Sequence, residues 1–348
     1  MWRLFQSPIL SLPLPLLFCF FLFTISTTVT SIPQRKLLAS LHLPTQDVYQ
    51  FPNETYLENL AVRSNGEILV TFITKPYLYL INTIEKSATL IFSFPDVLSG
   101  AGITEVDHDM FYVAAGNFSN FTTRPRSCSI WQVDMRSYPL YGATVTKVTD
   151  TPDAIALNGV TTLSRQNSTI LIADCVLGAV WIMNVKTGNY SIAIQVPAMD
   201  AVSTEPLPIG INGIKVWGGY LYFTNSDHGT MCRVPISTSG MATGAVEVLA
   251  TGLTPDDFDL DGKHRPWIAQ LDANVVSVLL KNGTVVNAAG AKDQLTVAGA
   301  TSCVFGRNSD GKGRSHLLYC TTSGGIDAPV NGTFIVGGKV VQIDTTGF

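Results

Sequence analysis

The chain has 348 residues, of which 14% are charged, and a formal net charge of −4. The low charge and the many Gly, Thr and Val residues suit one large all-β domain better than two domains of average size. The chain has no run of basic residues, which excludes an extended nucleic-acid interface.

The first residues of the chain predict a secretory signal peptide over residues 1–31. Arg3 precedes an apolar stretch that ends near Phe23, and small residues follow. Pro13 and Pro15 interrupt this short stretch, which argues against a membrane anchor. No later segment is long and apolar enough to span a bilayer. We therefore expect a protein of the secretory lumen or the extracellular space, with no membrane contact after cleavage.

The rest of the sequence predicts a repeat of short strands. Apolar segments alternate with Gly, Asn, Asp and Pro turns, and helical periodicity is nearly absent. The strands group into six units with a period of about 43 to 57 residues, which is typical of a β-propeller. The units begin at ENLAVR (58–63), GITEVD (102–107), NGVTTL (158–163), NGIKVW (212–217), DDFDLD (256–261) and TSCVFGR (301–307).

The sixth unit is one strand short, and the N-terminal part of the domain offers a replacement. Residues 46–60, QDVYQFPNETYLENL, resemble residues 88–103, ATLIFSFPDVLSGAGI, including the Phe-Pro that follows the strand. We expect residues 46–51 to complete the sixth blade and close the ring, which would remove an exposed sheet edge. One domain, a six-bladed β-propeller, then covers residues 42–348.

The first residues of the six innermost strands should converge on the propeller axis at one mouth. Asn212-Gly213 is usually a hairpin dipeptide, but here we expect Asn212 to face the axis and Gly213 to allow a close backbone approach. Asp257 is an alternative to Asp256, because the register is uncertain by one residue. The six positions are Glu58, Ala101, Asn158, Asn212, Asp256 and Ala300.

Carboxylate and amide oxygens dominate this ring. Such donors suit a hard cation, and Ca²⁺ more than Mg²⁺. Alternatively, the Asn-Gly pairs serve only to start the strands, and the polar groups are hydrated in a wet channel.

The residues of this ring resemble those of a known protein family. The chain is similar, along nearly all of the mature sequence, to the SMP-30/gluconolactonase-like six-bladed propellers. In that family the positions that match Glu58, Asn212 and Asp256 bind the metal, and the match of Asn158 faces substrate or metal. The match of Asp256 also acts as the base in lactone hydrolysis. The chain departs from the family where Glu-Gly-Pro is replaced by residues 58–60, Glu-Asn-Leu, and where Asp-Gly is replaced by Asp256-Asp257.

Longer segments resemble a fungal secreted branch of these propellers. They are GINGIKVWGGYLYFTNS, TPDDFDLD and the pair ATSCVFGR and LLYCTTSGG. That branch includes hetero-Diels–Alderases of tropolonic sesquiterpenoid biosynthesis, which join a tropolone-derived quinone methide to a humulene-type terpene. The resemblance implies a cyclase with small, apolar substrates.

A cycloaddition requires no cofactor and no nucleophile. It requires two apolar partners at reacting distance and a hydrogen-bond donor or cation near the heterodiene oxygen. The candidate catalytic residues are Asp256, His228 and Trp267, and the candidate substrate-binding residues are Asn158, Asn212, Phe118 and Gln270. The expected walls of the mouth are Phe72, Phe118, Phe121, Val176, Leu177, His228, Trp267, Gln270 and Leu271.

Three functions remain open. They are a cycloaddition catalyst, a metal-dependent lactonase or ester hydrolase, and a non-catalytic binding propeller. No GxSxG elbow occurs, and the five histidines lack metal-ligand spacing, so other hydrolytic classes are disfavoured.

Cysteines and sequons agree with secretion. Five cysteines follow the signal, and the odd number predicts two disulfides and one free thiol. We expect the pairs Cys128–Cys175 and Cys303–Cys320, with Cys232 free. The N-x-S/T sequons predict glycosylation at Asn53, Asn117, Asn120, Asn167, Asn189, Asn282 and Asn331.

Overall fold

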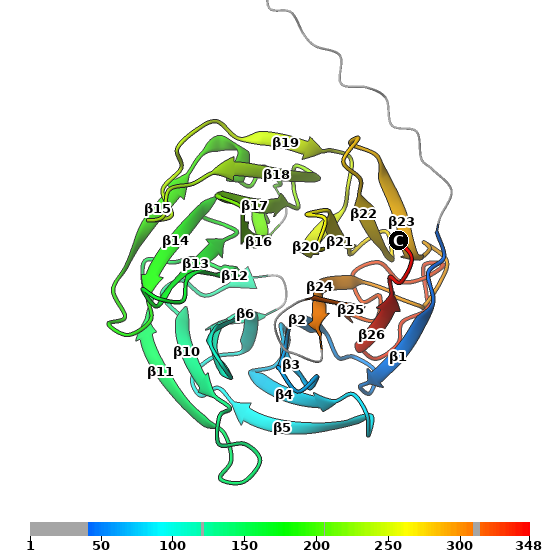
Figure 1. Ribbon diagram of the computed structural model, residues 1–348, viewed down its shortest axis with the longest axis horizontal. Coiled ribbons are helices and arrows are strands. Elements are labelled where there is room, and N and C mark those ends of the chain that lie inside the picture. The colour runs from blue at the N-terminus through cyan, green and yellow to red at the C-terminus, as the bar shows by residue number, and fades with distance from the viewer. Residues whose placement is uncertain (1–40, 120–121, 205, 309–313) are drawn as a thin grey trace, which may run out of the picture. The chain divides into compact units, whose positions relative to one another are not determined.

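The chain forms a β-propeller of six antiparallel four-stranded sheets (Figure 1). The computed structural model describes residues 41–119, 122–204, 206–308 and 314–348. All six sheets belong to one compact unit, residues 36–348. The all-β, six-bladed prediction is therefore confirmed, and the expected signal peptide lies outside the described residues. Within the described part of the chain, no helix has the length and apolar character of a membrane span.

The strands of the first five blades follow chain order from the axis outward (Figure 1). Blade 1 consists of β2 (Leu57–Val62), β3 (Ile68–Phe72), β4 (Tyr77–Asn82) and β5 (Ser87–Ser93). Blade 2 consists of β6 (Ser99–Asp107), β7 (Met110–Gly116), β10 (Ser129–Asp134) and β11 (Thr144–Asp150). Its β7–β10 connection carries a small hairpin, β8 (Phe118–Ser119) and β9 (Thr122–Thr123).

The next three blades repeat this plan. Blade 3 consists of β12 (Leu157–Ser164), β13 (Thr169–Asp174), β14 (Ala179–Asn184) and β15 (Tyr190–Gln195), and a short 3₁₀ helix, η1 (Pro197–Met199), follows it. Blade 4 consists of β16 (Ile211–Trp217), β17 (Tyr220–Asn225), β18 (Thr230–Pro235) and β19 (Glu247–Ala250). Blade 5 consists of β20 (Pro255–Leu260), β21 (Pro266–Gln270), β22 (Val275–Leu279) and β23 (Val285–Gly290).

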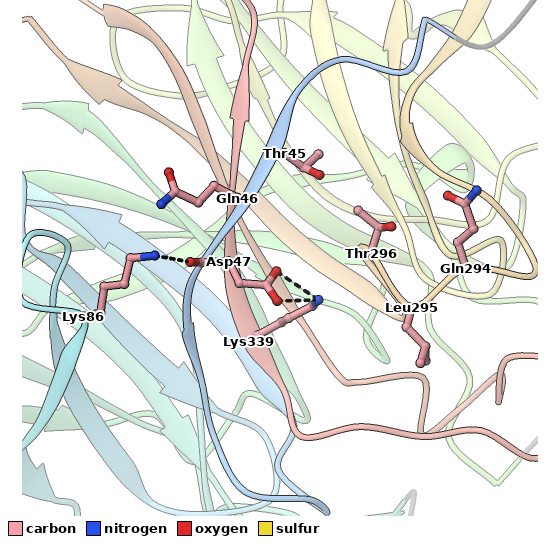
Figure 2. A pocket seen from close by; sticks show the side chains of 8 residues that line it. All are labelled: Thr45, Gln46, Asp47, Lys86, Gln294, Leu295, Thr296 and Lys339. Atoms are coloured by element: carbon pink, nitrogen blue, oxygen red, sulfur yellow. Dashed lines mark hydrogen bonds and ion pairs between the residues drawn. The ribbon is translucent and has the colours of Figure 1, made fainter.

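The sixth blade combines both ends of the propeller domain. Its strands are β24 (Ala300–Arg307), β25 (Arg314–Thr322), β26 (Lys339–Asp344) and β1 (Thr45–Gln50), which pairs antiparallel with β26. The Lys339 ammonium, on a side chain that is only 7% exposed, lies 3.0 and 3.2 Å from the two carboxylate oxygens of Asp47 (Figure 2). Lys86 of blade 1 also donates to the Asp47 carbonyl. Charge pairing thus adds to the backbone ladder that holds β1 in this blade.

Each innermost strand carries a β-bulge near its start. In blade 4, Ile211 pairs with Asn225 and Ile214 with Phe223, so residues 212 and 213 together face one residue of β17. A bulge interrupts a sheet ladder and redirects side chains. The sixth blade differs from the predicted alignment, because its bulged residue is Thr301 and not Ala300.

The core lies between the blades. Six apolar clusters occur in the described residues, one at each interface between neighbouring blades. The cluster between blades 6 and 1 joins Val48 and Val340 to Leu60 and Phe72. Because strands of both blades bury apolar faces, each blade depends on its neighbours for a complete core.

Candidate active site at one end of the propeller axis

Four polar side chains meet at the start of the innermost strands. Glu58, Asn158, Asn212 and Asp256 are each less than 10% exposed. Asn212 Nδ2 donates to Asp256 Oδ1 at 2.7 Å and to Ser226 Oγ at 3.0 Å. The four residues come from blades 1, 3, 4 and 5 and are called the channel mouth below. The expected ring therefore brings these side chains together, with Asp256 beside Asn212 as predicted.

The backbone at Gly213 lies close to Asp257 of blade 5, in agreement with the expected close approach. A Cβ atom on this residue would lie 2.2 Å from Asp257 Oδ1 and 2.7 Å from Asp257 Cα. The bulge of blade 4 therefore presses its backbone against the bulge of blade 5. Thr224 Oγ1 joins the same two bulges, because it receives a bond from Gly213 N and donates to the carbonyl of Asp256.

The two carboxyl groups of the channel mouth hold their protons more tightly than ordinary acids. Burial first, and then the charges of Asp257 and Asp327, raise the pKa of Glu58 to about 8, although a hydrogen bond with Asn158 acts in the opposite direction. The pKa of Asp256 is also raised well above its ordinary value, first by burial and then by the charges of Glu58 and Asp257. At neutral pH the channel mouth therefore contains protonated carboxyl groups, which are hydrogen-bond donors.

Acids deeper along the axis have cationic partners. Asp257 accepts from Lys215 Nζ at 3.1 Å and from Asn59 Nδ2 at 2.8 Å. Two more axial ion pairs join Asp259 to Arg314 and Glu105 to Arg307. Among the described residues, no cationic side chain forms an ion pair with Glu58 or Asp256. The channel mouth is thus the part of the axis where buried acids are left without a counter-charge, which is typical of a functional site.

Two amide oxygens of the channel mouth are also without partners. Asn158 Oδ1 and Asn212 Oδ1 are buried and accept no hydrogen bond from the described residues. Buried polar atoms are nearly always bonded, so this pair indicates a missing ligand, water or ion. No group of three or more His, Cys, Asp and Glu side chains in the described chain is placed to hold a metal. A mixed set of two carboxylates and two amide oxygens nevertheless fits the donor chemistry of Ca²⁺.

Tyr56 and Asp327 extend the channel mouth, and the sequence did not indicate them. The pKa of Tyr56 is raised well above its ordinary value by burial and then by the charges of Asp327, Asp256 and Glu58. Burial likewise raises the pKa of Asp327. Asp327 belongs to the long β25–β26 connection, so no strand pattern could place it beside Tyr56.

The other predicted site residues lie in second strands, in a turn and in the hairpin of blade 2. His228 is exposed in the β17–β18 turn. Gln270 accepts from Thr254 N and donates to Ser277 Oγ, and Phe118 is half-buried in β8.

Trp267 is 0% exposed and packs edge-on against Phe305 between blades 5 and 6. It lies near the start of β21, whereas channel-mouth residues of second strands lie near the strand end. Its predicted catalytic role is therefore corrected to core packing. Phe72 of the expected walls is likewise buried in the core, between blades 6 and 1. Phe121 lies outside the described residues.

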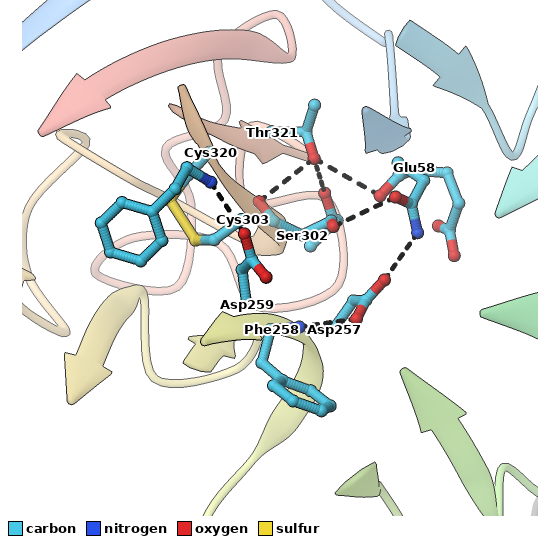
Figure 3. The surroundings of a disulfide bond; sticks show 11 residues. Glu58, Asp257, Phe258, Asp259, Ser302, Cys303, Cys320 and Thr321 are labelled. Carbon is cyan, nitrogen blue, oxygen red and sulfur yellow. Dashed lines mark hydrogen bonds between the residues drawn. A yellow bond between two sulfur atoms is a disulfide. The ribbon is translucent and has the colours of Figure 1, made fainter. Parts of the chain in front are cut away.

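One of the two expected disulfides is present. Cys303 and Cys320 face each other in the β24–β25 ladder and are bonded (Figure 3), and Cys232 is a buried free thiol as predicted.

The Cys128–Cys175 prediction is wrong, because both thiols are free and bond instead to the carbonyls of Ile155 and Ala156. Burial raises the pKa of Cys128 to about 11 and that of Cys175 well above its ordinary value. Neither thiol is suited to act as a nucleophile at neutral pH.

Most sequons lie where a glycan would be tolerated. Asn53, Asn167, Asn189, Asn282 and Asn331 are exposed. Asn117 is half-buried with a buried Oδ1 atom, and Asn120 lies outside the described residues. Glycosylation remains a prediction for these positions.

Solved structures of six-bladed propellers share this architecture. The calcium-binding protein regucalcin from Agrobacterium tumefaciens superposes with a TM-score of 0.61 at 14% identity, over 88% of this chain and 95% of that one. A structure described as a putative gluconolactonase gives a TM-score of 0.56 at 12% identity, over 89% and 94%. The chain has the fold of the SMP-30/gluconolactonase-like propellers.

Two fungal proteins are similar to this chain in sequence. "Putative hetero-Diels-Alderase asR5" from Sarocladium schorii is 29% identical over 351 residues, which cover 88% of this chain and 84% of that protein. "Putative hetero-Diels-Alderase" from a Phoma species is 26% identical over 312 residues, or 81% and 87%. No protein-family model matches the chain.

Proposed function

We propose that the chain is a cyclase of fungal biosynthesis that catalyses a hetero-Diels–Alder cycloaddition at the channel mouth. The names of the two fungal relatives, which match most of the chain, support this reaction class. The substrates we propose are a tropolone-derived quinone methide and a humulene-type terpene, joined in an intermolecular reaction. The disulfide agrees with a secretory location.

The chemistry needs no group beyond the two substrates. One C–C and one C–O bond form between the heterodiene and the alkene, three π bonds are consumed, and one new π bond appears. No atom leaves and no electron is exchanged with a cofactor. The protein lowers the barrier by holding the partners together, which contributes up to roughly 7–11 kcal/mol in favourable cases.

The observation that carries the proposal is the pair of buried acids without a cationic partner at the channel mouth, whose raised pKa values favour the protonated form. As the alkene donates electron density to the quinone methide, negative charge grows on the quinone oxygen. A protonated Glu58 or Asp256 can donate a hydrogen bond to this oxygen, and the bond strengthens as the charge grows. An ionised carboxylate would instead repel it.

A substitution series at Glu58 tests this role. The substrates are a tropolonic quinone methide, generated in the assay, and humulene, and the adduct is measured by chiral chromatography with mass detection. The wild-type rate should fall as the pH rises through about 8, because Glu58 then loses its proton. Glu58→Gln keeps an N–H donor, so it should retain activity and lose part of this pH dependence. Glu58→Ala should lower the rate by about 10²-fold.

Two results would contradict the proposal. The first is an adduct formed at the same rate and with the same stereochemistry in the absence of protein. The second is full activity in Asp256→Ala together with Glu58→Ala, which would show that the channel mouth takes no part. Glu85→Gln, at an exposed turn position, is the matched surface control.

A metal-dependent lactonase is the second candidate, and the unpartnered oxygens of Asn158 and Asn212 favour it. Together with Glu58 and Asp256 they would hold a Ca²⁺ ion, which would polarise the carbonyl of a bound lactone. Asp256 would then take a proton from the attacking water, as the family resemblance implies. This function requires ionised acids, so it and the cycloaddition demand opposite charge states at the same residues.

Metal content separates the two candidates. For the lactonase we expect bound calcium, hydrolysis of gluconolactone that EDTA abolishes, and loss of both in Glu58→Gln. A protein without calcium whose activity ignores EDTA would exclude the lactonase. For the cycloaddition, Glu58→Gln should remain active, so a single variant distinguishes the mechanisms.

A further inference from the structure

We infer that the propeller has a second small-molecule site, which binds a planar aromatic carboxylate on the face opposite the channel mouth. A hollow of about 540 Å³ opens between blades 4, 5 and 6, within the size range of ligand pockets. It is lined by Trp217, Asp261, Gly262, Lys263, Arg265, Phe305, Arg314, Ser315, His316, Thr345, Gly347 and Phe348.

The hollow is separate from the channel mouth. Asn212 is the second residue of β16 and Trp217 is the last, so the two sites lie at opposite ends of this strand. Five residues of extended chain span about 16 Å. The remaining lining residues come from the β20–β21 turn, the end of β24, the start of β25 and the C-terminal segment. A ligand in this hollow therefore would not occupy the proposed active site.

Aromatic side chains form the walls of the hollow. Trp217 is half-buried, and its ring lies 5.0 Å from the imidazole of His264 at a tilt of 53°. The guanidinium carbon of Arg314 lies 5.7 Å from the Trp217 ring and 5.8 Å from the Phe305 ring. Flat aromatic and guanidinium surfaces of this kind favour a flat, conjugated ligand.

Cationic side chains contribute most of the charged groups in the lining. The hollow has three cationic side chains, Lys263, Arg265 and Arg314, against the carboxylate of Asp261. Each of these cations already has an oxygen partner, because Arg265 pairs with Asp261, Arg314 pairs with Asp259 from behind, and Lys263 Nζ donates to the Phe348 oxygen at 2.9 Å. The remaining N–H groups of the three cations, and not an excess of charge, favour an anion over a neutral ring.

The two arginines are held in place with donors to spare. Arg265 bonds Asp261 Oδ2 through Nε at 2.7 Å, and its guanidinium carbon lies 4.5 Å from the Phe348 ring. Arg314 makes its ion pair through Nη1. A guanidinium has five N–H donors, so each arginine retains others for the two oxygens of a carboxylate. Pre-positioned forks of this kind reduce the entropy cost of binding.

The tryptophan indole signals allow a direct test. In the mature protein labelled with ¹⁵N at indole nitrogens, Trp217→Phe identifies the Trp217 signal, and 2-naphthoate is added as the probe. The other described tryptophans, Trp131, Trp181 and Trp267, are at most 6% exposed. We expect a saturable shift of the Trp217 signal, weakened by salt, and at least about fivefold weaker binding of neutral 2-naphthamide.

Substitutions of the cationic residues test which of them bind the carboxylate of the probe. Lys263→Gln and Arg314→Gln should each weaken 2-naphthoate binding about fivefold or more, while Lys281→Gln, an exposed turn lysine of blade 5, should leave it unchanged. Arg314→Lys, which keeps the charge opposite Asp259, shows whether a loss reflects folding. The absence of a saturable shift up to about 5 mM probe would overturn the proposal. Equal binding of acid and amide, or full binding by both charge variants, would overturn it as well.

Discussion

Glu58 shows how a single buried residue couples stability to pH. It is 6% exposed, its neighbours are amides and other acids, and its pKa is about 8 instead of the ordinary value of 4.5. Between these two values the folded protein binds a proton that the unfolded chain has already released. The free energy of unfolding therefore falls as the pH rises from about 4.5 to about 8.

We predict that Glu58→Gln flattens this pH dependence. The amide has the same shape but no proton to lose, so the variant should become more stable than the wild type above about pH 7, by an amount of the order of a few kcal/mol. Urea unfolding from about pH 5 to about pH 8.5 measures the slope. Asp256 also has a raised pKa, so some slope should persist. Identical slopes in wild type and variant would contradict the assignment, and Glu85→Gln should leave the slope unchanged.

The individual residues of the site were only partly predictable. Asn158, Asn212 and Asp256 follow from the strand repeat, because each begins an innermost strand at the same end of the axis. The prediction for Trp267 failed because this residue lies near the start of β21, whereas the channel mouth is formed at the end of the second strands. Tyr56 and Asp327 meet only through the folded β25–β26 connection, which no local pattern describes.

The β-bulges of the innermost strands are the elements that shape the channel mouth. The bulges of blades 3 and 4 place Asn158 and Asn212 in the channel mouth, and the glycine after each Asn lets its bulge touch the bulge of the next blade. The strand repeat predicted five of the six positions. It missed Thr301 because one extra residue in a ladder changes the register without changing the hydrophobic pattern.

Gly213→Ala tests the contact between bulges. The new Cβ would meet Asp257 at 2.2 Å, and the nearby backbone cannot move without shifting blade 5. We predict a loss of about 3 kcal/mol of unfolding free energy, at the upper end of overpacking costs. Gly262→Ala is the matched control, because its Cβ would meet no atom within 4 Å. Urea denaturation of both variants measures the difference in unfolding free energy. Equal values would show that the bulges of blades 4 and 5 can move apart without loss of stability.

At the scale of the whole molecule, the ring depends on a strand from the start of the propeller. β1 supplies the outer strand of blade 6, and its residue Val48 packs in the cluster shared with blade 1. The repeat of Phe-Pro segments pointed to this strand, but the ion pair between Asp47 and Lys339 could not be predicted. It joins residues 292 positions apart, and only the register of β1 on β26 brings them together.

Charge reversal at this pair tests how strongly the ring depends on it. Lys339 is almost buried and Asp47 is half exposed, so Asp47→Lys should place two ammonium groups together and cost about 1–2 kcal/mol. The double variant Asp47→Lys with Lys339→Asp should recover much of this loss, since the opposite charges meet again. Lys86→Gln, which removes only an exposed bond to the Asp47 carbonyl, is the control. Thermal unfolding is measured for the wild type, the two single variants, the double variant and the control. A double variant no more stable than the additive sum of the single changes would show that backbone pairing and apolar packing alone hold β1 in the ring.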